Sequence, residues 1–153
     1  MSVKPKPDGY HSITPYLIIK DAAAAIELYK KLFGAQVMVR MDAPGGGIGH
    51  AELKIGDSVI MMASEYHEMG YLSPLARGGT PVSLLLYVEK VDAVFDAAIA
   101  AGCKSMKPVQ DQFYGDRMGT FEDPFGHVWS VATHIEDVSP DEMKKRMAAM
   151  SQK

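Results

Sequence analysis

Residues 115–134 read GDRMGTFEDPFGHVWSVATH, and this stretch decides the fold. Its Asp-Pro-Phe-Gly segment at 123–126 places a hydrogen-bonding side chain, a preset φ and a permissive glycine where a type I turn and its exit require them. The runs on either side, 117–122 and 128–134, have strand-forming sequences, and the second is rich in β-branched and aromatic residues. The stretch therefore predicts a tight hairpin, which must pack against another layer because a lone hairpin is marginal in water.

Composition sets the class of protein. The chain has 153 residues, of which 47% are hydrophobic and 23% charged, so it can bury a core. Its formal net charge is −3 with both signs interspersed, which argues against nucleic acid or an anionic membrane as a partner. No apolar run approaches the roughly 18 residues of a membrane span, and the polar first ten residues lack a leader's apolar segment, so we expect a cytoplasmic protein. The single cysteine, Cys103, excludes an internal disulfide and a cysteine-based zinc site.

The first half of the chain follows the order βαβββ. A helix is predicted where Asp21 supplies a cap, strong helix formers follow and Gly34 ends the run. Glycine-bearing turns separate the later strands, which is typical of a meander. The predicted elements are a strand at 13–20, a helix at 22–33 and strands at 35–41, 48–55 and 58–63.

The same order returns in the second half. Residues 64–80 show no sustained period and contain several glycines and a proline, so we expect a loop or short helical turn joining two modules. A shift of 68 positions places Gly34-Ala35 on Gly102-Cys103, which supports an internal repeat. The predicted elements are a strand at 81–88, a helix at 91–102, a strand at 104–108 and the opening hairpin.

A C-terminal helix at 139–151 is predicted by Ser139, Pro140 and Glu142, which together resemble a helix start with a capping box. Met143, Met147 and Met150 fall on one stripe of this helix, which must cover the body of the protein or a partner subunit. Isolated helices rarely leave such a surface bare, so we predict a homodimer.

The segments IIKDAAAAIELYKKLFGA (18–35), HAELKIGDSVIMMA (50–63) and FEDPFGHVWSVATH (121–134) resemble the vicinal oxygen chelate superfamily, most closely its PhnB-like branch. That superfamily contains glyoxalase I, extradiol dioxygenases, fosfomycin-resistance enzymes and bleomycin-binding proteins. The resemblance implies an α+β fold in which two βαβββ modules form a cupped mixed sheet, here followed by the C-terminal helix. It divides one domain into a first module at 11–63, a connecting loop at 64–80 and a second module at 81–136.

In the superfamily the concave face binds a small molecule, frequently with a divalent metal held by His, Gln or Glu at one position on each of four strands. Carried over, these positions fall on Thr14, Glu52, Ser83 and Ser130, of which only Glu52 is a good ligand. Neutral hydroxyls are poor ligands for zinc, nickel or iron. We therefore expect no resident metal and no cofactor, although the nearby His11 and His134 leave another alignment open.

Strand alternation extends the candidate site, because residues two apart share a face. His50 and Glu52 lie about 6.6 Å apart along their strand, so they are candidate catalytic acid and base, or could anchor a ligand amine. The alternative is a solvated His and an exposed Glu on an ordinary strand. The predicted ligand-binding residues are Thr14, Tyr16, His50, Glu52, Ser83, Leu85, Tyr87 and Ser130.

Two functions remain open. The first is a small-molecule-binding protein of the drug-sequestering kind, which requires a partly aromatic pocket and no metal. The second is a metal-dependent lyase, isomerase or dioxygenase of the same superfamily. A methyltransferase finds no support, because no glycine-rich nucleotide loop follows a strand and opens a helix.

Overall fold

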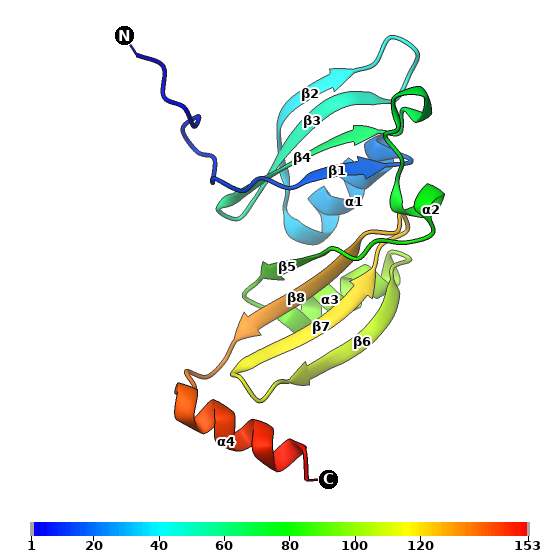
Figure 1. Ribbon diagram of the computed structural model, residues 1–153. Coiled ribbons are helices and arrows are strands. Elements are labelled where there is room, and N and C mark those ends of the chain that lie inside the picture. Colours follow the sequence, from blue (N-terminus) through cyan, green and yellow to red (C-terminus); the bar gives the residue numbers. More distant parts are fainter. Residues whose placement is uncertain (1, 153) are drawn as a thin grey trace. The chain divides into compact units, whose positions relative to one another are not determined.

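The structure is a computed structural model and describes residues 2–152. The chain divides into two compact units, Met1–Thr80 and Pro81–Lys153, which are described separately (Figure 1). Residues 64–80, predicted to connect the modules, form part of the first unit.

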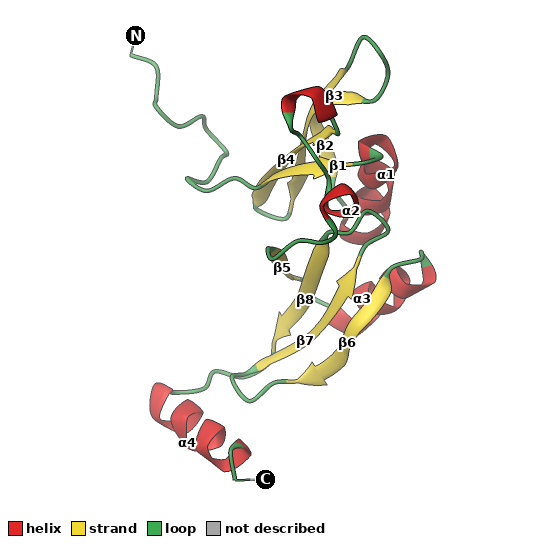
Figure 2. Cartoon of the chain, turned by 45° about the vertical axis from the view of Figure 1, so that its right-hand side comes forward, coloured by secondary structure: helices red, strands yellow, loops and turns green. Residues whose placement is uncertain are grey.

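The first unit is a mixed four-stranded sheet with a helix across one face (Figures 1 and 2). Its strand order is β1-β4-β3-β2, with β1 parallel to β4 and the other pairs antiparallel. Two short helical turns follow the sheet. The elements are β1 (Tyr16–Ile19), α1 (Ala22–Phe33), β2 (Gln36–Asp42), β3 (Ile48–Ile55), β4 (Ser58–Ser64), η1 (His67–Met69) and α2 (Pro74–Arg77).

The second unit repeats this plan. Its strand order is β5-β8-β7-β6, with β5 parallel to β8, and α3 lies across one face of the sheet. The elements are β5 (Ser83–Tyr87), α3 (Val91–Ala100), β6 (Lys104–Asp111), β7 (Asp116–Glu122), β8 (Val128–His134) and α4 (Pro140–Met150). The predicted α+β fold of two βαβββ modules and a C-terminal helix is confirmed.

Helix α1 begins and ends where its sequence predicts. The Asp21 carboxylate accepts a hydrogen bond from the Ala24 N–H, and Gly34 ends the helix in the left-handed conformation at φ 65°. Ile26 and Tyr29 are buried, as are Leu17 and Leu53 of the sheet. The apolar face of α1 and alternate residues of the strands thus form the core of the first unit.

The predicted hairpin is organised by Asp123. This carboxylate is 4% exposed and accepts hydrogen bonds from the backbone N–H groups of Phe125 and His127 and from Trp129 Nε1. The Gly126 N–H donates to the Asp123 carbonyl, and Gly126 has φ 87°, which favours glycine. One side chain therefore fixes both the turn and the buried Trp129.

Helix α3 approaches the second sheet closely over Gly119. A Cβ at this position would lie 2.8 Å from Phe95 of the helix and 2.8 Å from Val109 of β6. The missing side chain lets Phe95 pack edge-on against Phe121, at 6.1 Å between ring centroids.

Two predicted boundaries differ by three residues from those in the structure. The first strand was expected at 13–20, but β1 covers only Tyr16–Ile19, and the chain before it forms an arm. The strand expected at 104–108 continues to Asp111. It crosses Pro108 because β6 is an edge strand, where a residue without an N–H is tolerated.

Helix α4 starts as predicted, since the Ser139 hydroxyl accepts from the Glu142 N–H. The Glu142 carboxylate pairs with Arg146, which also binds Glu136 and donates to the Phe113 carbonyl. These bonds fasten the helix to the turn between β6 and β7. No helix formed by residues 2–152 is long and apolar enough to span a membrane.

Candidate functional site

The face of the first sheet opposite α1, called the open face below, carries three of the eight candidate residues: Tyr16, His50 and Glu52. Register places Tyr16 of β1 beside Met61 of β4, and Met61 beside Glu52 of β3. His50 lies two residues before Glu52, on the same side of the strand. The predicted grouping of Tyr16, His50 and Glu52 on one face agrees with this register.

A chain of hydrogen bonds links four side chains on the open face. The Tyr10 hydroxyl donates to Glu52 Oε2 at 2.6 Å, and the Tyr16 hydroxyl lies 2.8 Å from His50 Nδ1. His50 Nε2 lies 3.4 Å from Glu52 Oε1. A neutral His50 protonated at Nε2 satisfies both of its contacts, with Tyr16 donating to Nδ1. Glu52 is only 8% exposed, so its carboxylate is a buried acceptor rather than a solvated surface group.

The environment of these hydrogen-bonded side chains raises the pKa of both Tyr10 and Tyr16. For Tyr10 the main cause is its hydrogen bond to Glu52, followed by desolvation. For Tyr16 the main cause is desolvation, followed by repulsion from Tyr71 and Glu52. Both hydroxyls therefore remain protonated and act as donors at neutral pH.

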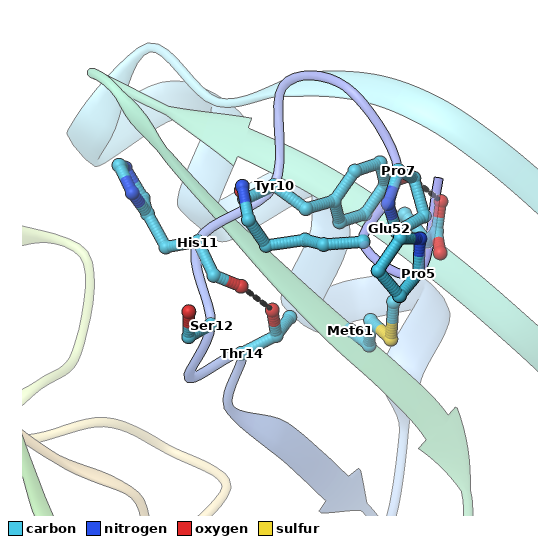
Figure 3. Close-up of a pocket in the computed structure, with 9 residues that line it drawn as sticks. Pro5, Pro7, Tyr10, His11, Ser12, Thr14, Glu52 and Met61 are labelled. Atoms are coloured by element: carbon cyan, nitrogen blue, oxygen red, sulfur yellow. Dashed lines mark hydrogen bonds between the residues drawn. The ribbon is translucent and has the colours of Figure 1, made fainter. Parts of the chain in front are cut away.

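The N-terminal arm lines an open pocket next to Glu52 (Figure 3). The pocket has a volume of about 530 Å³, and Thr14 and Met61 contribute to its wall. Figure 3 shows His11 turned away from Glu52, and His11 Nε2 instead contacts the Asp57 carbonyl at 2.9 Å. The Thr14 hydroxyl donates to the His11 carbonyl, so Thr14 shapes the arm.

A larger groove of about 1180 Å³ lies on the same unit, next to Tyr16. Ile18 and Ile48 line it with apolar side chains, together with residues of the loop between β2 and β3. Tyr66 and Tyr71 also line the groove. An apolar lining with a few polar groups is typical of sites for small organic molecules.

The loop that carries Tyr66 and Tyr71 is closed by Glu65. The Glu65 carboxylate accepts from both the hydroxyl and the backbone N–H of Ser73, and His67 Nε2 lies 2.8 Å from it. These bonds, with that of Ser73 foremost, lower the pKa of Glu65 to about 2. Tyr66 and Tyr71 also exchange backbone hydrogen bonds of 2.9 and 3.1 Å. These bonds link the two ends of the loop to each other.

The predicted site residues of the second module lie on its own sheet. Ser83, Leu85 and Tyr87 are exposed along one side of β5, and register pairs Leu85 with Ser130. Ser130 Oγ lies 2.8 Å from Thr120 Oγ1, so the two hydroxyls satisfy each other. As ligand contacts, these four residues remain predictions.

The Tyr87 hydroxyl donates to Asp116, which is 4% exposed and also contacts His134 Nδ1 at 2.7 Å. His134 contacts Asp137 through its other nitrogen. Hydrogen bonds to these two carboxylates, that of Asp116 first, raise the pKa of His134. The sequence left open an alignment in which His134 takes a metal-ligand position. In the structure His134 is engaged with Asp116 at the end of the sheet.

Three of the four positions that the family resemblance implies for metal ligands make hydrogen bonds within the chain. Glu52 is engaged by Tyr10 and His50, Thr14 by the arm, and Ser130 by Thr120. No group of three or more His, Cys, Asp or Glu side chains within the described residues is arranged to hold an ion. In the second sheet Ser130 of β8 pairs with Leu85 of β5. The residue in the same position of the first sheet is Met61 of β4, which pairs with Tyr16 of β1, and not Glu52 of β3.

Sequence reasoning missed three tyrosines of this region. Tyr10 lies in a polar arm, and Tyr66 and Tyr71 lie in a segment without periodicity. Strand alternation cannot assign a face to such residues. Their only signal in the sequence is an aromatic side chain among polar and glycine residues, where no core position requires one.

Comparison with known proteins identifies the family. The sequence model described as Glyoxalase/Bleomycin resistance protein/Dioxygenase superfamily matches residues 9–131. The chain belongs to this superfamily. The family is the one suggested by the motifs at 18–35, 50–63 and 121–134.

Individual proteins are similar to this chain along most of their length. Protein Rv0887c of Mycobacterium tuberculosis (strain ATCC 25618 / H37Rv) is 37% identical over 141 residues, covering 90% of this chain and 83% of its own. TioX from Micromonospora sp. ML1 is 26% identical with a TM-score of 0.63, covering 84% of this chain and all (100%) of its own. A Bacillus cereus PhnB protein, described as a putative 3-demethylubiquinone-9 3-methyltransferase, has 21% identity and a TM-score of 0.62, covering 80% of this chain and 99% of its own. The last likeness concerns the fold alone.

Proposed function

We propose that this protein binds a small organic molecule on the open face of its first sheet, without a resident metal. The observation that carries the proposal is the chain formed by Tyr16, His50 and Glu52 beside an apolar groove. The buried Glu52 carboxylate can accept a hydrogen bond or attract a positive charge. An apolar groove contributes affinity and the polar chain contributes orientation.

The donor set supports binding over metal chemistry. Hydroxyl groups replace imidazole and carboxylate at three of the four positions that the superfamily uses for metal ligands. Elemental analysis after purification without chelator tests this choice. We expect less than stoichiometric zinc, nickel, iron or manganese, and one tightly held ion per chain would favour the lyase, isomerase or dioxygenase alternative.

A ligand screen tests the binding site. Thermal shift with a set of aromatic and cationic small molecules supplies candidates, and calorimetry compares the wild type with Glu52→Gln and His50→Ala. For a ligand that contacts Glu52, losing the charge should cost on the order of 1 to 3 kcal/mol of binding free energy, because Glu52 is buried.

The matched control is Glu27→Gln on α1, whose side chain is 68% exposed and should leave affinity unchanged. Melting temperatures of all variants should stay close to that of the wild type. Unchanged binding of every ligand in both Glu52→Gln and His50→Ala would show that the site assignment is wrong.

The second part of the proposal concerns assembly as a homodimer. Met147 and Met150 of α4 are 55% and 59% exposed, and none of the described residues of this helix is buried. A second copy that covers these side chains would remove apolar surface from water. Sedimentation velocity should give about twice the chain mass of 16.7 kDa, and removal of residues 139–153 should shift the equilibrium toward the monomer. A monomer at micromolar concentration would refute the dimer.

A further inference from the structure

Three tyrosines line the groove of the first unit, one from a strand and two from a loop. Tyr16 belongs to β1, whereas Tyr66 and Tyr71 face each other across the closed loop after β4. All three remain about half exposed, at 49%, 50% and 49% respectively. None of them is a core residue, so the fold does not need these rings for its own packing.

The electrostatics of the groove favour positive charge. The described residues that line it include one acid, Glu65, and no Lys, Arg or His. Glu65 is ionised at neutral pH, and its bonds to Ser73 and His67 stabilise the charged form further by lowering its pKa to about 2. The buried Glu52 lies further along the same face. Aromatic ring faces are negative as well, so the walls and the acids attract the same kind of ligand.

The Tyr16 side chain and the backbone of Tyr66 and Tyr71 are held by hydrogen bonds in the absence of a ligand. The Tyr16 hydroxyl is fixed by His50, and the two rings lie 5.5 Å apart between centroids. The backbones of Tyr66 and Tyr71 are fixed by their mutual hydrogen bonds and by the hydrogen bond that Glu65 accepts from Ser73. Such preorganisation lowers the entropic cost of binding.

From these observations we propose that the groove binds an organic cation of the alkylammonium class, with its charged group against the rings of Tyr16, Tyr66 and Tyr71. The inference rests on the proposed function, and it names the ligand class of that site. Tyrosine rings recognise quaternary ammonium groups through cation–π attraction, which does not require a hydrogen-bond donor on the ligand. Glu65 acts through charge alone, because its oxygens are engaged by Ser73 and His67.

A matched pair of probes tests the cation. Choline and 3,3-dimethyl-1-butanol have nearly the same shape, but only choline is charged. Calorimetry at millimolar ligand should show choline binding at least about tenfold more tightly than the neutral alcohol. Equal affinity for the two would overturn the cation while leaving a small-molecule groove in place. Failure of both to bind would overturn this ligand class, and the broader screen would then decide the proposed function on its own.

A matched pair of substitutions tests the rings. Tyr71→Leu should weaken choline binding by roughly 5- to 30-fold, whereas Tyr71→Phe keeps the ring and should stay within about twofold of wild type. Tyr66→Leu and Tyr66→Phe repeat the comparison on the other side of the loop. Melting temperatures confirm that the variants fold, and Tyr71 is half exposed, so little core packing is lost. Leucine variants that bind choline as tightly as wild type at both positions would refute the tyrosine site.

Discussion

The two modules share one topology and one ladder register, but they place their ionisable groups differently. In the first module the middle of the open face carries a buried carboxylate joined to His50 and two tyrosines. In the second the same place carries two hydroxyls that bond to each other. The matched positions are Tyr16, Met61 and Glu52 in one sheet and Leu85, Ser130 and Thr120 in the other.

This difference teaches how a repeated fold can divide its tasks. The second module uses its buried acids at its turns and sheet end, where Asp123 organises the hairpin and Asp116 holds Tyr87 and His134. The first module keeps Glu52 in mid-sheet, where strand pairing alone would not need it. A polar group that the fold does not require is a candidate for function.

The largest effect on stability should come from the acid of the second module's hairpin, Asp123. Asp123→Ala removes the acceptor of two backbone N–H groups and of Trp129 Nε1 in a buried site. We expect a loss of about 3 kcal/mol in the free energy of unfolding, measured by urea denaturation.

Asp57 occupies the matching hairpin of the first module and is the control. Its side chain is 90% exposed and accepts from the Ser58 hydroxyl, so Asp57→Ala should change stability by less than about 0.5 kcal/mol. Similar losses for the two variants would break the contrast between the modules.

A smaller effect should appear in acid, in the first module. The stabilising contribution of Glu65 is fully present above its ordinary pKa of 4.5 and is lost as the pH falls toward its folded pKa of about 2. Ser73→Ala removes the strongest cause of this shift and the cap of α2, so it should cost about 1 to 2 kcal/mol at neutral pH.

Urea denaturation from neutral to acid pH measures both effects. The loss of stability on acidification should be shallower in Ser73→Ala than in wild type. Parallel pH profiles for the two proteins would show that the hydrogen bond from Ser73 does not lower the pKa of Glu65.

The smallest effect on stability should appear in the second module, where stability is lost as the pH rises rather than as it falls. Bonds to Asp116 and Asp137 raise the pKa of His134 above its ordinary 6.5. Its contribution to stability is therefore fully present below pH 6.5 and is lost as the pH rises through the raised folded value. The effect is modest because the side chain is 51% exposed and solvent screens it.

Nuclear magnetic resonance titration of the imidazole protons checks this prediction directly. His134 should titrate above an exposed histidine, and Asp116→Asn should move its pKa back toward the ordinary value. If the pKa of His134 is the same in Asp116→Asn as in wild type, Asp116 does not control this histidine, and the described contrast between the modules loses one of its two buried acids.

The fold could be predicted where local signals and packing agree. The helix at Ala22–Phe33 and the strands at Ile48–Ile55 and Val128–His134 have their predicted limits, since caps or tight turns bound them. The strand across Pro108 was cut short, because its edge position is set by pairing in three dimensions.

The candidate site was only half visible in the sequence. Alternation along one strand was enough to bring His50 and Glu52 together. The partners Tyr10, Tyr66 and Tyr71 come from an arm and a loop, whose paths depend on side-chain bonds such as those of Glu65. Such bonds join residues whose spacing follows no period, so no pattern predicts them.

The bond between Tyr10 and Glu52 has a kinetic consequence. Tyr10 precedes β1 by six positions, so its hydroxyl competes for Glu52 as a tethered group with an effective concentration in the millimolar range. A ligand that uses Glu52 has its apparent affinity reduced by the fraction of molecules in which Tyr10 has already left. As ligand concentration rises, the observed rate of such binding levels off at the rate at which the arm releases the carboxylate.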